Sequence, residues 1–482
     1  MNGGRAYHSA VRETLERELK LDVNGTFALP ELPGSPLPER TFTSTYHDTP
    51  ARSLGRAGIT LRRRVENGTS LWQLKLPRVG TGERLELEEP GGPGGPPPEL
   101  ARLLVAHMRH GRLEPVATLR THRSGVRVEE DGRQLADVTV DEVTILYAEH
   151  GVPGFTEVEV ELIGDGAEPD LEHIGRVLRD AGAEAGSGEP KLMRVLELPA
   201  REAPKRNAPL HEQLRHALEI QLDAVEAHDP GVRLGGDPED LHQLRVATRR
   251  TRALIRATRP LLGDTLAALG EELKLLAGLL GAVRDLDVLI DHLAPDVASL
   301  DVDREQGEEL LTALGAERAM QRAVLIDAME TPRYAALLDA FRAAIDGIEP
   351  VDAPSGADEI AARALRKLRH AAAALPSEPS DGELHELRIA AKRVRYAAEL
   401  ASLGGGKKAA RTVTAFKRLQ DVIGEHQDTV VAEERIRRVA RPETAVAAGR
   451  LIERERVRKA EMRKRYPAAL RKALRKGRKA FS

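Results

Sequence analysis

The sequence predicts an α+β chain in two parts: an N-terminal antiparallel β-barrel tunnel with flanking helices, and a C-terminal all-α bundle made of a duplicated helical unit. Three observations predict this architecture. Up to about Pro199, short segments alternate apolar and charged residues and are separated by Gly and Pro. After it, long segments rich in Ala, Leu, Arg and Glu have helical periodicity. In that second part, one motif occurs twice.

The composition excludes several classes of protein. The chain of 482 residues contains no cysteine, which excludes a disulfide framework, a thiolate nucleophile and a cysteine-ligated metal. The N-terminus lacks the apolar core of a signal peptide and no segment approaches the length of a membrane span, so we expect a cytoplasmic protein that does not interact with a membrane. The net charge of −3 conceals a basic end after Arg450. That end suits an anionic partner, although a solvated tail is the commoner interpretation of a single charge run.

Each predicted strand of the first part has one apolar and one charged face. In LERELKLDV, residues 15–23, leucines alternate with Glu16, Glu18 and Lys20. The same alternation recurs in LRRRVE, LWQLKLP, ERLELEEP and FTEVEVEL, and helices are expected over residues 99–110 and 170–181. For one strand alone, a half-exposed sheet with charges facing solvent is the simplest interpretation. Because nearly every strand repeats the pattern, we favour a barrel with a charged interior and an apolar exterior covered by helices.

Such an interior suits phosphate chemistry. Arg and Lys bind phosphate oxygens, and Arg can do so with two parallel hydrogen bonds. Carboxylates would repel a polyanion unless a hard cation lay between them, and ligands that are all oxygen favour Mg²⁺ or Mn²⁺ over zinc. Hydrolysis of a phosphoanhydride can proceed on such charges and metal ions without a covalent nucleophile.

ERELK, residues 16–20, resembles the ExExK signature of the CYTH domain, the triphosphate tunnel fold. Further segments resemble that family in the same order: YHDTPARSLGRAGITLRRR, LWQLKLP, ERLELEE, VDEV and EVEVEL. The resemblance covers about residues 10–198 and implies a metal-dependent triphosphatase. It implies that the metal is held by Glu16, Glu18, Glu157, Glu159 and Glu161. It implies that phosphate binding and the interior network involve Lys20, Arg62, Arg64, Lys75, Arg120, Arg123, Asp141 and Lys191.

The second part repeats a basic helix. LHQLRVATRRTR begins at Leu241 and LHELRIAAKRVR at Leu384, an offset of 143 residues. The candidate anion-binding residues are His242, Arg245, Arg249, Arg250, Arg252 and Lys274 in the first copy, and His385, Arg388, Lys392, Arg393, Arg395 and Lys417 in the second. Steps of three and four place a histidine and three cations on one helical face, where like charges repel each other. A solvated basic face is the simpler interpretation of one copy, but the duplication favours a phosphate-binding face.

These motifs resemble the CHAD domain, a duplicated helical domain that is named for its histidines and associated with binding inorganic polyphosphate. The resemblance runs from about residue 207 to near residue 480, and we assign the domain to 207–482. A CYTH domain followed by a CHAD domain is itself a recognisable architecture. It supports both resemblances.

The leading hypothesis is an Mg²⁺- or Mn²⁺-dependent hydrolase of inorganic triphosphate or a related triphosphate, with a polyphosphate-binding module. A non-catalytic polyphosphate-binding or granule-associated protein is one alternative. A nucleotide or thiamine triphosphate enzyme of the same fold is another, because fold does not determine substrate. Nucleic acid is not an expected partner, since the helical part shows no base-reading or aromatic stacking motif. The sequence assigns no oligomeric state.

Overall fold

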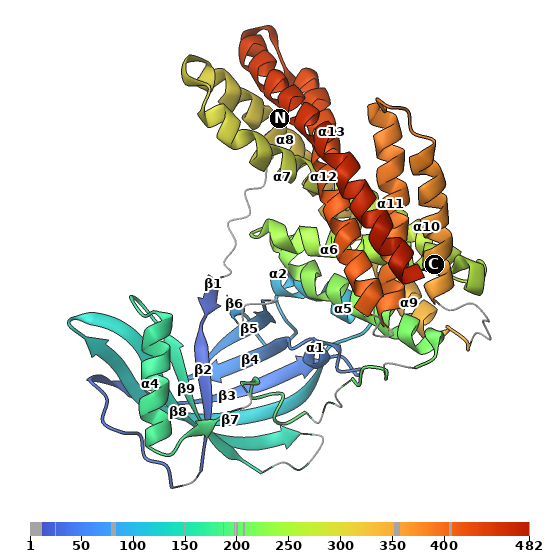
Figure 1. The fold of residues 1–482 in the computed structure, drawn as a ribbon. Helices are drawn as coiled ribbons and strands as arrows, with labels where there is room; N and C mark the ends of the chain where they lie inside the picture. Colours follow the sequence, from blue (N-terminus) through green and yellow to red (C-terminus); the bar gives the residue numbers. More distant parts are fainter. Residues whose placement is uncertain are drawn as a thin grey trace. The chain divides into compact units, whose positions relative to one another are not determined.

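The computed structural model describes residues 12–24, 26–78, 83–148, 151, 153–186, 188–196, 198, 201–205, 208–350, 357–403 and 407–481. The chain divides into two compact units, Met1–Arg201 and Glu202–Ser482. The first contains an antiparallel sheet and the second is all-helical (Figure 1), which confirms the predicted α+β class. The predicted domain limits at residues 10, 207 and 482 lie outside the described residues.

One ten-stranded antiparallel sheet forms the first unit. Its strands are β1 (Arg12–Glu16), β2 (Glu18–Val23), β3 (Gly34–Asp48), β4 (Thr60–Glu66), β5 (Thr69–Pro77), β6 (Arg84–Pro90), β7 (Glu114–Glu130), β8 (Arg133–Ala148), β9 (Phe155–Leu162) and β10 (Glu184–Ala185). They are hydrogen-bonded in the order β1-β6-β5-β4-β3-β7-β8-β9-β2-β10. Only Arg17 separates β1 from β2, so the chain itself joins the strand at one end of this series to the strand next to the other end. The strands therefore surround one interior, although the hydrogen-bonded series does not close into a ring.

The apolar strand faces point outward and are covered. Helix α4 (Glu168–Asp180) packs Leu171, Ile174 and Leu178 against valines of β8 and β9. Figure 1 shows this helix lying along the sheet beside β2 and β9. Each fully buried leucine or isoleucine contributes roughly 2 kcal/mol of transfer free energy. This burial keeps the charged faces of the same strands turned inward, because successive side chains point to opposite faces.

The two expected helices of this unit have different outcomes. The helix expected over 170–181 is α4, whose N-terminus is capped by Asp170, which accepts a hydrogen bond from the backbone N–H of Ala167 (2.8 Å). The segment expected as one helix over 99–110 is instead three short turns: α2 (Pro98–Ala101), the 3-10 helix η1 (Arg102–Leu104) and α3 (Val105–Met108). The backbone leaves helical geometry at Leu104. A further short helix, α1 (Ser53–Arg56), follows β3.

Nine α-helices, with short 3-10 turns η2 (Asp301–Asp303) and η3 (Pro442–Thr444), form the described part of the second unit. They are α5 (Leu210–Leu234), α6 (Pro238–Leu262), α7 (Ala267–Ala298), α8 (Arg304–Met329), α9 (Pro332–Asp346), α10 (Ala357–Ala373), α11 (Asp381–Leu403), α12 (Lys407–Val439) and α13 (Ala445–Phe481). In the described part of the chain, no helix combines the length and apolar character needed to span a bilayer.

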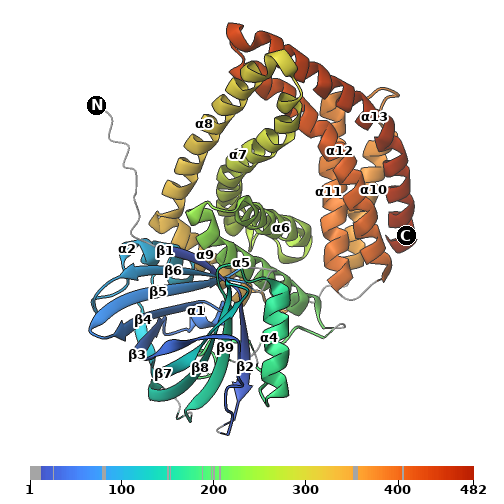
Figure 2. The ribbon, with the colours of Figure 1, turned by 90° about the vertical axis from the view of Figure 1, so that its left-hand side faces the viewer.

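The helical unit is duplicated, as its sequence motifs predict. Helices α5 to α8 correspond to α10 to α13, and α7 and α12 keep the offset of 143 in their buried residues, for example Leu276 and Leu419. Helices α10 to α13 pack side by side (Figure 2) around a core that includes Phe416 and Leu419. Helix α9 follows the first copy and has no counterpart after the second among the described residues.

Candidate functional site

The charged strand faces line a cavity of about 990 Å³ inside the first unit, which we call the central cavity. Ten of the predicted residues line it: Glu16, Glu18, Lys20, Arg62, Arg64, Lys75, Arg123, Glu159, Glu161 and Lys191. Their strand neighbours on the opposite faces are buried apolar residues such as Leu21, Leu61 and Val160. The alternation in the sequence therefore places these charges in the interior and not toward solvent.

Three predicted residues lie elsewhere. Asp141 and Glu157 are fully buried behind the cavity wall, where Arg123 donates two hydrogen bonds of 2.6 Å to the carboxylate of Asp141. Arg120 is exposed and does not line the cavity. Residues three apart on a strand point to opposite faces, so Arg120 and Arg123 do not share the interior.

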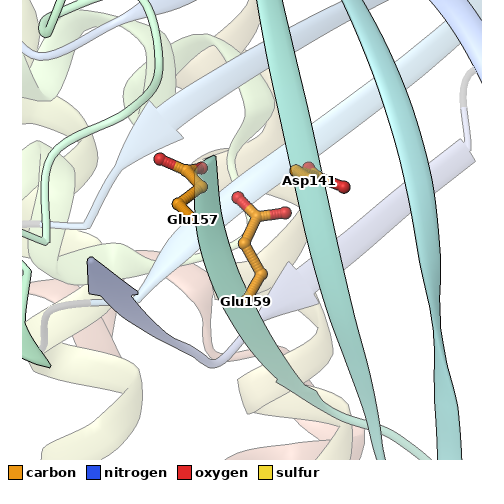
Figure 3. Close-up of side chains that lie close together, drawn as sticks. All are labelled: Asp141, Glu157 and Glu159. Atoms are coloured by element: carbon orange, nitrogen blue, oxygen red, sulfur yellow. The ribbon is translucent and has the colours of Figure 1, made fainter. Parts of the chain in front are cut away.

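Lys191 occupies the centre of one carboxylate group. Asp141 on β8 and Glu157 and Glu159 on β9 point toward one another (Figure 3) and have oxygens within 4.8 Å of each other. The Lys191 ammonium lies 2.9 Å from Asp141, 2.5 Å from Glu157 and 2.7 Å from Glu159. Burial favours neutral Lys191, but these carboxylates overcome it and raise the pKa of the ammonium. A protein cation thus already neutralises this acidic group.

Glu159 is the most strongly compensated of these carboxylates. Lys20 and Arg123 also donate to it, the latter at 2.6 Å. Although burial favours its protonated form, Lys191, Lys20 and Arg123 hold the pKa of Glu159 well below its usual value. It is therefore ionised at neutral pH and orients three cations.

A second carboxylate group surrounds the break between β1 and β2. Glu18 lies opposite Glu161 in the register of β2 and β9, and Glu16 is close enough to perturb Glu161. Lys75 donates to both oxygens of Glu16 (2.6 and 2.7 Å), and Lys20 lies 3.3 Å from Glu18.

Glu161 itself forms no ion pair among the described residues. Burial, followed by the charge of Glu16, raises its pKa to about 7, with smaller contributions from Glu159 and Glu18. The group therefore has fewer cations than carboxylates. This excess negative charge, presented by oxygen ligands to the cavity, suits a hard divalent cation. Among the described residues, however, the carboxylate oxygens that lie within 4.8 Å of one another are those of the group that Lys191 fills, so Glu16, Glu18 and Glu161 would have to move closer together to share one ion.

The opposite wall of the cavity carries positioned guanidinium groups. Arg62 donates to Gln73 (2.8 Å) and to the hydroxyl of Tyr46 (3.2 Å). Arg64 donates to Glu66 (2.7 Å) and lies 3.7 Å above the ring centre of Phe42. Burial and then the neighbouring Arg62 lower the pKa of Arg64 to about 10. Two guanidinium groups that repel each other in this way favour a polyanion between them.

In the second unit the duplicated basic helices α6 and α11 contact each other. Arg245 donates to Asp285 (2.9 Å), and both Arg245 and Arg388 have a buried Nε–H without a hydrogen-bond partner. Each guanidinium lies over a glycine: a methyl group at Gly281 would come 3.6 Å from Arg245 Nη2, and one at Gly424 would come 3.8 Å from Arg388 Nη2. The two copies therefore place their arginines equivalently.

We call the facing cations Arg245, Arg249, Arg388 and Lys392 the basic seam. Burial lowers the pKa of Lys392 to about 7, and the charges of Arg388, Arg249 and Arg245 add to this effect. The pKa of Arg388 is lowered by burial too, against an opposing effect of Asp428. The seam thus concentrates mutually repelling cations at the contact between the two copies.

Comparison with known proteins follows the same division. Residues 14–193 match the CYTH domain and residues 216–437 match the CHAD domain. Two uncharacterized proteins from two strains of Mycobacterium tuberculosis are each 31% identical over 465 residues, which covers 88% of this chain and 88% of theirs. The chain belongs to the CYTH–CHAD family.

Several solved structures are similar to parts of this CYTH–CHAD protein. PptA from Streptomyces chartreusis is 22% identical and covers 54% of this chain and 98% of its own, with a TM-score of 0.47. The CHAD domain of the plant Ricinus communis is 25% identical and covers 57% and 97%, with a TM-score of 0.48. HpAC1 from Hippeastrum, described as having a dominant triphosphatase activity, is 20% identical and covers 38% and 97%, with a TM-score of 0.27.

Several candidate residues of the CHAD unit lie outside the basic seam. Arg250, Arg393, Lys274 and Lys417 are exposed, and Lys274 pairs with Glu271 (3.0 Å). The remaining candidates flank the seam: Arg252, Arg395, His242 and His385. The two histidines differ. His385 Nδ1 donates a hydrogen bond to the side-chain oxygen of Gln427 (3.0 Å), which stands at the place of Arg284, whereas burial and Arg284 lower the pKa of His242.

Other residues of the CYTH cavity had no role assigned from sequence. They are Arg12, Arg40, Tyr46, Gln73, Arg84, Glu86, Glu88, Arg127 and Asp137. The alternation in ERLELEE was a sufficient signal for Arg84, Glu86 and Glu88, because it places them on one strand face. Gln73 on β5 links the two neighbouring strands: it accepts a hydrogen bond from Arg62 of β4 (2.8 Å) and donates one to Glu86 of β6 (3.2 Å).

Proposed function

We propose that the CYTH unit is a divalent-metal-dependent triphosphatase that hydrolyses inorganic triphosphate or a related phosphate chain. One observation carries the proposal: a single cavity presents buried guanidinium and ammonium groups together with the under-compensated carboxylates Glu16, Glu18 and Glu161. Cations alone would suit a binding site. Carboxylates that face the same space are of use to a polyanion only with a metal ion between them.

Glu16, Glu18 and Glu161 would hold the metal, with Mg²⁺ or Mn²⁺ expected from their oxygen ligands. Glu157 and Glu159 are engaged by Lys191, so their role is to position that ammonium unless the lysine moves. When bound, the divalent ion neutralises charge on the phosphate oxygens. This assignment divides the five predicted glutamates into two groups with different tasks, and Glu157 acts from behind the cavity wall.

The cations would bind and orient the phosphate chain. Arg62 and Arg64 face it from β4, Arg123 from β7, and Lys20 and Lys75 from the side of the carboxylates. Because Tyr46, Gln73, Glu66 and Asp141 already hold the arginines, little reorganisation is needed when the substrate binds. Such fixed charges stabilise the negative charge that shifts to the leaving phosphate.

The cavity favours an inorganic chain over a nucleotide or thiamine triphosphate. Phe42 and Tyr46 are the aromatic residues of its described lining, and Arg64 covers the Phe42 ring while Arg62 lies 5.9 Å from that of Tyr46. Neither ring leaves an open face for stacking a base or a thiazolium. The second candidate is a polyphosphate-binding or granule-associated protein whose central cavity has no catalytic activity. This candidate leaves the carboxylates of the cavity without a function.

We propose further that the CHAD unit binds polyphosphate at the basic seam, and that this unit recruits the chain, as a cytoplasmic protein, to polyphosphate granules. The buried and unpartnered Nε–H groups of Arg245 and Arg388 support an anionic ligand there. A chain with a charge on every phosphate would engage several fixed cations at once and relieve their repulsion.

One assay tests the catalytic proposal. Phosphate release from triphosphate, long polyphosphate, ATP and thiamine triphosphate is measured with Mg²⁺ and with Mn²⁺. We expect the fastest release from triphosphate and complete, reversible inhibition by EDTA. Release from thiamine triphosphate or ATP alone would favour the organic substrates, and the absence of release from all four would favour the non-catalytic protein.

A further inference from the structure

A second cationic groove lies in the CHAD unit between α10 and the C-terminal half of α13. We call it the tail groove; it has a volume of about 1110 Å³. Its cations are Arg366, Arg369, Arg471, Lys472, Arg475 and Arg478. His370 and small or aliphatic residues such as Ala372, Ala468 and Leu474 form the rest of its described lining. The basic end of the chain is therefore not a row of independent solvated side chains, because the groove combines it with arginines from α10.

Five of the six Arg and Lys residues of the tail groove lack compensation among the described residues. No carboxylate belongs to its described lining, and Arg366, Arg369, Arg471, Lys472 and Arg475 make no ion pair among the described residues. Two cations outside the groove on the same two helices pair with acids one turn away. Arg363 lies 3.6 Å from Glu359, and Lys464 lies 2.7 Å from Glu461. The five lining cations named above have no such helix pairing among the described residues.

The duplication does not account for this charge. At the offset of 143 residues, Arg366 corresponds to Asp223 and Arg369 to Glu226, so the sign of the charge is reversed between α10 and α5. In the first copy α9 also packs against α5 and α8, whereas α10 and α13 pack directly on each other. The tail groove is thus a property of the second copy alone.

We propose that the tail groove is a second binding site for a linear inorganic phosphate chain, separate from the basic seam. Its cations on α13 extend from residue 471 to residue 478, about 10 Å of helix at 1.5 Å per residue. Those of α10 face them across the groove. The cations of α10 and those of α13 both suit an extended anion with a charge on each of its units. The open groove admits such a chain without reorganisation of the protein.

Polyphosphate fits this site better than nucleic acid. The described lining contains no Phe, Tyr or Trp on which a base could stack and no amide side chain that could read a base edge, and its one ring is the imidazole of His370. The choice of polyphosphate rests on the proposed function of the CHAD unit, while the existence of an anion site rests on the groove itself. A chain long enough to occupy groove and seam together would bind more tightly than a short chain, because the second contact is intramolecular.

The test compares two charge-matched double variants of the full chain. Arg366→Glu with Arg471→Glu alters the groove, and Lys367→Glu with Lys479→Glu alters exposed lysines of the same helices that do not line it. Binding of long-chain polyphosphate and of triphosphate is measured by competition with a labelled chain in EDTA, which stops turnover. We expect the groove variant to bind long chains about tenfold more weakly, with a shallower dependence on salt, and the control to change less than about twofold.

The outcomes separate the two proposals. Equal affinities of groove variant and control would overturn the tail groove as a site. Single-stranded DNA is tested as a competitor at matched phosphate concentration. If it displaces labelled polyphosphate from the wild type as well as unlabelled polyphosphate does, and the groove variant loses this displacement, polyphosphate is overturned as the ligand of the tail groove. Phosphate release from triphosphate, measured on the same proteins with metal, reports on the CYTH proposal alone. Thermal unfolding confirms that each variant is folded, and a single-residue variant, Arg369→Glu, replaces any double variant that is not.

Discussion

The central cavity and the basic seam both concentrate arginine and lysine, but the two regions treat the charges in opposite ways. In the cavity, burial lowers the pKa of Lys191 and Lys75, and neighbouring carboxylates more than reverse this effect. In the seam, burial lowers the pKa of Arg388 and Lys392, and neighbouring cations deepen the effect on the lysine. The cavity is therefore organised before an anion arrives, whereas the seam is stabilised by the anion.

This difference matches the two proposed tasks. Catalysis requires fixed groups, because reorganisation during the reaction raises its barrier. Binding of a long polyanion gains instead from uncompensated charge, which raises both the encounter rate and the affinity. Three substitution experiments and one change of pH would break or sharpen the comparison.

Glu18→Gln should have the largest effect, a loss of about 100- to 1,000-fold in phosphate release from triphosphate, because it removes one carboxylate of the proposed metal group. The rate is measured at saturating Mg²⁺ and Mn²⁺, together with the thermal midpoint. Glu142→Gln, on the exposed face of β8, is the matched control and should leave the rate unchanged. Equal rates for the wild type and Glu18→Gln would contradict the metal assignment.

Charge reversal of the seam, Arg245→Glu with Arg388→Glu, should weaken polyphosphate binding about 100-fold and leave phosphate release from triphosphate unchanged. The loss follows from removing the two arginines whose Nε–H groups lack protein partners. Arg250→Glu with Arg393→Glu changes the same charge at equivalent, exposed positions of the same helices. If this control weakens binding equally, net charge and not the seam determines affinity.

A change of pH should act on the seam through Lys392, whose pKa is lowered to about 7 by burial and by Arg388, Arg249, Arg245 and Arg395. The ammonium form predominates below pH 7 and the neutral amine above it, so polyphosphate should bind roughly three- to tenfold more tightly at pH 6 than at pH 8. Lys392→Arg stays charged over this range and should remove most of the dependence. Calorimetry in buffers of different ionisation enthalpy should detect proton uptake on binding by the wild type and less by the variant.

Much of the cavity could be predicted because strand periodicity is a local property. The alternation around Glu16, Glu18 and Lys20 determines which side chains share a face, and burial of the leucines decides which face points inward. Arg120 shows where the resemblance predicts more than the strand geometry allows, since it cannot face the same way as Arg123 without a β-bulge between them. Lys191 lies in an irregular segment, where no period indicates its direction. Its position among three carboxylates depends on tertiary structure alone.

In the helical unit, the repeat predicted which residues are equivalent but not which are adjacent. An offset of 143 residues relates Arg245 to Arg388, yet the contact between α6 and α11 depends on how two bundles pack. For the same reason, exposed Arg250 and Arg393 could not be separated from the seam without knowing which helix face is covered. The tail groove could not be predicted from the repeat either, because α10 and α13, the two helices that form it, are not equivalent to each other.

The smallest effect should come from Tyr46→Phe, which removes the hydroxyl that accepts a hydrogen bond from Arg62 (3.2 Å) and keeps the ring. Gln73 still holds the same guanidinium at 2.8 Å. The expected result is a rise of about threefold in KM for triphosphate, which corresponds to ~0.7 kcal/mol, with little change in kcat. Tyr147→Phe, at an exposed tyrosine of β8, controls for loss of a hydroxyl. A large fall in kcat would instead mean that the hydroxyl contacts the reacting phosphate, and Arg62 would then be oriented by Gln73 alone.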